Sequence, residues 1–89
     1  MALIAQDIIR EKIGRNQKFI YQMQESMMNK YILNVNWARN LSARLENIDA
    51  VNGERDRTIN HIYEVLDNDY NEMLIYLNQD KTTTHNIKR

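Results

Sequence analysis

The sequence contains no cysteine, no proline and only two glycines among its 89 residues. Without cysteine, neither a disulfide framework nor a thiolate metal site can form. Proline breaks the interior of a helix, so its absence, together with the scarcity of glycine, favours long uninterrupted helices. We therefore expect an all-α fold.

Long apolar runs are also missing. No stretch approaches the roughly 18 apolar residues that a membrane-spanning helix requires. Asp7, Arg10 and Glu11 interrupt the N-terminal segment, which argues against a secretory signal peptide. We expect a cytoplasmic protein without membrane association. A chain of this length holds one domain with a limited core, and many such chains gain stability by forming oligomers.

The formal net charge is zero, but the charges are unevenly distributed. Residues 1–45 contain seven basic and three acidic side chains, whereas residues 46–89 contain five and nine. One interpretation is that two antiparallel segments of opposite sign attract each other. The other is a basic surface near the first helix junction that holds a small anion. Because no cluster of Lys and Arg dominates, binding to long nucleic acid is disfavoured.

The two glycines divide the chain into three apolar segments. Ala2–Ile13 is expected to form a short helix, with Gly14 as its left-handed C-terminal cap. Apolar residues spaced by threes and fours predict one long helix over Asn16–Ile48, for which Asn16 is a candidate N-cap. After a turn at Gly53, a third helix packs antiparallel to the second. The predicted domain covers residues 1–79, followed by a polar, flexible tail over residues 80–89.

More than one face of each long helix is apolar, which predicts a homo-oligomer. Met23, Leu33 and Trp37 fall off the main stripe of the second helix, so we expect them at a subunit interface. Asn34 occupies a position in the apolar seam where a buried amide can fix the register. Alternatively, Val35 takes that place and Asn34 is exposed.

No catalytic or metal-binding motif is present, so the protein is expected to be neither an enzyme nor a cofactor or metal carrier. His61 and His85 lack the spacing of a zinc site. The acidic side chains of the third segment are better explained as a solvated or cross-helix charged face than as paired acid–base groups. These are Glu64, Asp67, Asp69 and Glu72.

Two aromatic residues follow Gly14 beside basic groups. Phe19 and Tyr21 are flanked by Arg15 and Lys18. A ring next to cations can stack on a nucleobase while the cations meet a phosphate. The alternative is that these rings pack at a subunit contact.

The order of segments and several short motifs resemble the phage anti-CBASS cyclic-nucleotide sponges, a family of small helical proteins that assemble as hexamers. Leu41-Ser42-Ala43-Arg44-Leu45-Glu46 is similar to a run "LIERLR" before the family's turn. Arg57-Thr58-Ile59 opens a segment whose apolar positions match those of the family's last helix. Met28-Asn29 resembles a family "MN", and Thr82-Thr83 resembles a "TT" after the last helix.

The resemblance implies sequestration of a bacterial immune messenger without cleavage, in the cytoplasm of an infected host. The family holds its cyclic dinucleotide through a Tyr and a Lys, whose nearest equivalents are Tyr21 and Lys30. Phe19, Thr82 and Thr83 complete the expected site. A family Arg associated with cyclic trinucleotides falls on Ile75, which argues against that ligand. The alternative functions are a helical protein that inhibits or bridges a host protein, and a purely structural oligomer.

Overall fold

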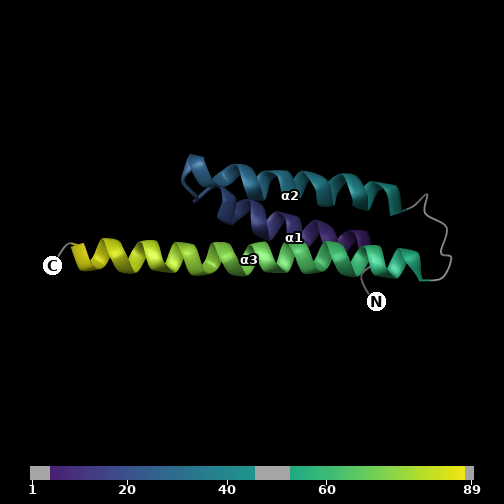
Figure 1. The fold of residues 1–89 in the computed structure, drawn as a ribbon. Helices are drawn as coiled ribbons and strands as arrows, with labels where there is room; N and C mark the ends of the chain where they lie inside the picture. Colours follow the sequence, from purple (N-terminus) through teal and green to yellow (C-terminus); the bar gives the residue numbers. More distant parts are fainter. Residues whose placement is uncertain (1–4, 46–52, 88–89) are drawn as a thin grey trace.

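The computed structural model describes residues 5–45 and 53–87, with side chains described as far as residue 79. These residues form three helices and no strand, so the all-α prediction is confirmed. The helices are α1 (Ala5–Ile20), α2 (Glu25–Arg44) and α3 (Glu54–Ile87). Figure 1 shows that α2 runs opposite to both α1 and α3.

The predicted helix boundary at Gly14 is wrong, because α1 continues through this residue to Ile20. The buried positions Ile9, Ile13, Asn16 and Ile20 lie at helical spacing on both sides of the glycine. Their burial outweighs the roughly 1 kcal/mol that a glycine costs inside a helix. Asn16, proposed as an N-cap, is instead a buried side chain in the second half of α1.

The chain turns at residues 21–24, inside the segment predicted to be one continuous helix. Backbone hydrogen bonds from Gln22 N to Phe19 O (2.9 Å) and from Met23 N to Ile20 O (3.0 Å) close the turn. Gln24 then adopts an extended conformation and α2 begins. Met23 is buried at 6% exposure, so it ties the turn to the core. The segment has no Gly or Pro that would favour a turn by itself, so the burial of Met23 stabilises the turn.

All three helices contribute to a single core, and α1 packs against both of the others. The N-terminal helix is therefore longer than predicted and is a full member of the bundle. The fully or nearly buried apolar residues are Ile9, Ile13, Ile20, Met23, Tyr31, Val35, Ala38, Leu45, Ile62, Leu66 and Met73.

The longest helix, α3, extends beyond α1 and α2 at its C-terminal end (Figure 1). The molecule is accordingly elongated, with principal extents of 58 × 28 × 19 Å. Residues 80–87 of the predicted tail are helical, and the flexibility of this segment stays a prediction. None of the described helices is long and apolar enough to cross a bilayer.

Candidate functional site

Basic side chains of α1 pair with an acidic side chain of α3. Lys12 Nζ and Arg15 Nη2 each lie 2.8 Å from Asp67 Oδ1. Burial alone would raise the pKa of Asp67, but the hydrogen bonds and charges of Lys12 and Arg15 lower it on balance. Basic and acidic parts of the chain therefore attract each other at this seam, although between two parallel helices and not between the antiparallel segments that the sequence suggested.

Phe19, predicted to stack on a nucleobase, stacks on a ring of its own chain. Its ring lies parallel to that of Tyr70, with centroids 4.8 Å apart. The Arg15 guanidinium lies over the same Tyr70 ring, 4.0 Å from its centroid. The ring and cation that the sequence placed next to a ligand thus join α1 to α3.

Lys30 is likewise engaged within the chain. Its Nζ lies 2.9 Å from Glu72 Oε1, and Tyr31 Oη donates to the same oxygen at 3.2 Å. Through these hydrogen bonds and the Lys30 charge, the pKa of Glu72 is lowered. Glu72 and Asp67 thus belong to a cross-helix charged face, as the sequence indicated.

The structure does not gather the predicted ligand residues into one pocket. Phe19 lies on the α1–α3 seam, Lys30 on the α2–α3 seam, and Tyr21 in the turn with 78% of its surface exposed. Thr82 and Thr83 belong to the last turns of α3, and their side chains lie outside the described part of the chain.

The three residues predicted at a subunit interface lie in three different environments. Met23 belongs to the core, so its assignment to a subunit interface is wrong. Trp37 is half-buried and meets the His61 ring edge-on at 5.3 Å, which places it in the contact between α2 and α3. Leu33 is 67% exposed, so it stays available to a second molecule.

Val35, and not Asn34, fills the core position of α2. Asn34 is half-buried and donates through Nδ2 to Asp69 Oδ2 at 2.7 Å. Burial raises the pKa of Asp69, and the hydrogen bond from Asn34 only partly opposes that effect. The amide therefore lies at the side of the seam, where it supports a buried carboxyl group.

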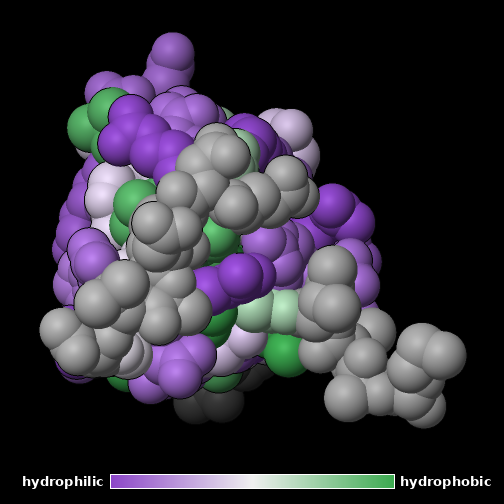
Figure 2. Space-filling model, turned by 90° about the vertical axis from the view of Figure 1, so that its right-hand side faces the viewer, coloured by the Kyte–Doolittle hydropathy of each residue, from purple (hydrophilic) through white to green (hydrophobic). Residues whose placement is uncertain are grey.

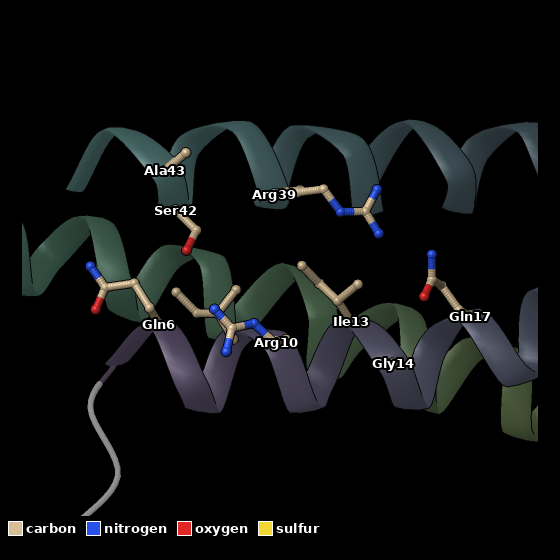
Figure 3. Close-up of a pocket in the computed structure, with 9 residues that line it drawn as sticks. Gln6, Arg10, Ile13, Gly14, Gln17, Arg39, Ser42 and Ala43 are labelled. Carbon is tan, nitrogen blue, oxygen red and sulfur yellow. The ribbon is translucent and has the colours of Figure 1, made fainter. Parts of the chain in front are cut away.

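A feature that the sequence did not reveal is an open groove of about 540 Å³ between α1 and α2 (Figure 3). Two arginines, one on each wall, line it, and none of its described lining residues is acidic. The lining consists of Gln6, Ile9, Arg10, Ile13, Gly14 and Gln17 from α1 with Arg39, Ser42 and Ala43 from α2.

Small residues keep the groove open. Gly14 has no side chain, and a Cβ built on it would meet no atom within 4 Å apart from its chain neighbours and the backbone of its own helix. Ser42 and Ala43 on the opposite wall are also short. On a closely packed helix pair these positions would carry larger apolar residues. The groove is therefore present because the facing side chains of the two helices are too small to fill the space between them.

The arginines of the groove are only weakly neutralised. Arg10 Nη1 lies 3.2 Å from Asp7 Oδ1, but its side chain is 78% exposed, and surface pairs of this kind contribute little. Arg39 Nη1 donates to Asn36 Oδ1 at 3.3 Å. Within residues 5–45 and 53–79, no carboxylate lies within ion-pair distance of Arg39. The groove therefore favours an anion.

The sequence did contain a signal for this site. Gln6, Arg10, Gly14 and Gln17 follow one another at helical spacing, but the pattern has meaning only if α1 continues past Gly14. The described residues contain no group of three or more His, Cys, Asp or Glu side chains that could hold a metal ion.

Comparisons with protein-family models, curated proteins and solved structures find no match for this chain.

Proposed function

We propose that this protein is a non-catalytic binding protein that sequesters a small phosphate-bearing ligand of the cyclic-oligonucleotide class. One observation carries the proposal: Arg10 and Arg39 face a groove whose described lining contains no carboxylate. The chemical class of the ligand comes from the resemblance to the phage sponges. Capture of this kind needs tight binding and no catalytic group.

The chemistry of the groove suits such a ligand. Guanidinium groups form strong, charge-assisted hydrogen bonds with phosphate oxygens. Gln6, Gln17 and Ser42 add neutral donors, while Ile9 and Ile13 offer an apolar floor for the uncharged part of the ligand. A volume of about 540 Å³ lies within the range of roughly 300–1,000 Å³ that is usual for small-molecule sites.

The groove replaces Phe19, Tyr21 and Lys30 as the proposed place of binding. Phe19 already stacks on Tyr70, and Lys30 already pairs with Glu72. Both side chains thus have partners within the chain, whereas an anion entering the groove adds a charged partner for Arg39.

Calorimetry with a panel of cyclic dinucleotides and their linear counterparts tests the proposal. We expect Arg10→Gln and Arg39→Gln each to weaken binding at least tenfold, about 1.4 kcal/mol. Lys18→Gln, which removes an exposed charge of α1 outside the groove lining, is the matched control and should bind normally. If no cyclic nucleotide binds the unmodified protein, the proposed function is wrong.

Tyr21→Ala and Lys30→Ala complete the panel because they separate the groove from the site implied by the resemblance. We expect both variants to keep their affinity. If these two variants bind tenfold more weakly and the arginine variants bind normally, the proposed sequestration stands. The binding site then lies near Tyr21 and Lys30 and not in the groove.

We also propose that the protein forms a homo-oligomer, for which the resemblance suggests a hexamer. Large apolar side chains are exposed on α2 and α3, with Leu33 at 67% and Ile75 at 58%. The same exposed side chains favour the second candidate function, inhibition or bridging of a host protein. A stoichiometric host protein recovered with the purified chain, in place of bound nucleotide, would support that second candidate.

A further inference from the structure

The N-terminal half of α2 and the middle of α3 carry almost no charge on their exposed positions. The two segments are residues 29–36 and 68–79, and they lie side by side, since Lys30 Nζ is 2.9 Å from Glu72 Oε1. Within these segments Lys30 and Glu72 are the only exposed side chains with a charge, and they neutralise each other. We call the exposed residues of the two segments the neutral surface.

Aliphatic and amide side chains take the place of charges on the neutral surface. Of the five large apolar residues that are exposed in the described part of the chain, four lie here, namely Ile32, Leu33, Leu74 and Ile75. The surface also contains five exposed asparagines, which are Asn29, Asn36, Asn68, Asn71 and Asn78. Other parts of the molecule differ. Figure 2 shows a mostly hydrophilic rim at the end where α3 begins, and the exposed residues of α1 are all charged, namely Arg10, Glu11 and Lys18.

Helix formation does not explain the asparagines. Asparagine is a poorer helix former than the lysine and glutamate that commonly cover exposed helix positions. Leu33 lies between Asn29 and Asn36 at helical spacing, and Ile75 follows Asn71 by one turn. Exposed aliphatic side chains among uncharged polar ones match the centre of a protein interface, where charged residues are depleted.

We infer that the neutral surface is the contact through which two copies of this chain associate about a two-fold axis. In such a contact a patch meets its own copy, so a patch with charges of one sign would repel itself. The neutral surface has balanced charges, and each of its amides both donates and accepts, so it can pair with itself. The groove, with Arg10 and Arg39 and no acidic lining residue among those described, has no such self-complementarity. This inference rests on the proposed homo-oligomer, and it adds the surface and the symmetry of the contact.

Opposite charges introduced at Asn71 test the contact. Asn71 lies near the middle of the α3 segment, so a two-fold axis through the neutral surface brings its two copies near each other. For Asn71→Lys alone and for Asn71→Glu alone, we expect a dissociation constant of self-association at least tenfold higher than that of the original chain. An equimolar mixture of the two variants places opposite charges together and should recover the association. Sedimentation at several protein concentrations measures the mass of each sample.

Two controls separate association from folding. Both substitutions introduce better helix formers at an exposed position, so the unfolding temperature of the variants at low concentration should not fall. Asn60→Lys is the matched control, because Asn60 is exposed on α3 about three turns before Asn71 and outside the neutral surface. This variant should keep the mass of the original chain.

The outcomes distinguish the surface from the oligomer itself. If the Asn71 variants keep the mass of an oligomeric original chain, the neutral surface is not the contact and the proposed oligomer stands. Loss of association by both variants without recovery in the mixture would overturn the two-fold contact. A monomeric original chain would overturn this inference together with the proposed oligomer.

Discussion

The Arg15 guanidinium lies 4.0 Å from the centroid of the Tyr70 ring and also donates to Asp67 Oδ1 at 2.8 Å. One side chain thus makes a cation–π contact and an ion pair with two residues of α3 that are one turn apart. Arg15 is therefore a structural residue of the α1–α3 seam, where it shares the Asp67 carboxylate with Lys12.

Removing the Asp67 charge should make the stability of the protein less dependent on pH. The pKa of Asp67 is lowered in the folded state. The ionised carboxylate therefore stabilises the fold above the ordinary pKa of 3.8, and this stabilisation is lost as the pH falls through the lower pKa of the folded state. Asp67→Asn should cost about 1 kcal/mol at pH 7, because both ion pairs are partly exposed, and less near pH 2. Urea unfolding at the two pH values measures the difference, with Glu64→Gln as an exposed control on the same helix that should change little at either pH.

Asp69 should behave in the opposite sense. Burial raises its pKa in the folded state, so folding favours the protonated carboxyl, and this preference costs stability as the pH rises through the folded value. Asp69→Asn keeps an oxygen that can accept from Asn34 and removes the buried charge. We expect the variant to be more stable than the original chain at pH 7 and no more stable at pH 2. A lower stability at pH 7 would show that the charge of Asp69 supports the fold.

Asn16 should be intolerant of change. Its Nδ2 donates to the backbone oxygen of Leu66 at 2.9 Å, and the residue is 1% exposed. Asn16→Ala should lower the free energy of unfolding by roughly 1–3 kcal/mol through the lost bond and packing. Asn16→Asp should cost more, because it places a charge against a carbonyl oxygen. Similar losses for the two variants in chemical denaturation would contradict this account.

Trp37 and Leu33 should have separate effects on folding and assembly. Trp37 is half-buried against His61, so Trp37→Ala should lose roughly half of the 3–5 kcal/mol typical of a buried aromatic residue. Leu33→Ser should leave the stability of the isolated chain nearly unchanged and reduce self-association. Light scattering of the original protein should give a mass several times 10.7 kDa. A monomer at micromolar concentration would contradict the proposed oligomer.

The helical class followed directly from composition and from the spacing of apolar residues. The stripe of α3 was identified correctly because Ile62, Leu66 and Met73 recur at helical steps, although the buried Asp69 lies between the last two. Val35 and Ala38 of α2 were found for the same reason. These patterns depend only on local geometry, so the sequence is sufficient to read them.

The first turn could not be predicted because the two strongest local signals pointed elsewhere. Gly14 marks a helix end by propensity, yet packing of α1 on both neighbours continues the helix through it. Residues 21–24 turn with no glycine or proline, held by the burial of Met23. This error also hid the groove, whose α1 wall lies on both sides of Gly14. The partners of Phe19 and Lys30 lie more than 40 positions away, so no local pattern reveals them.

The distribution of contacts along the chain has a consequence for the order in which the fold forms. The turn at 21–24 joins α1 to α2 over a few residues, whereas the bonds from Asn16 to Leu66 and from Arg15 to Asp67 span 50 and 52 positions. Closing the longer loop costs more chain entropy, so α1 and α2 should associate first and α3 should dock late. Substitutions that weaken the α1–α3 seam should therefore accelerate unfolding more than they slow refolding.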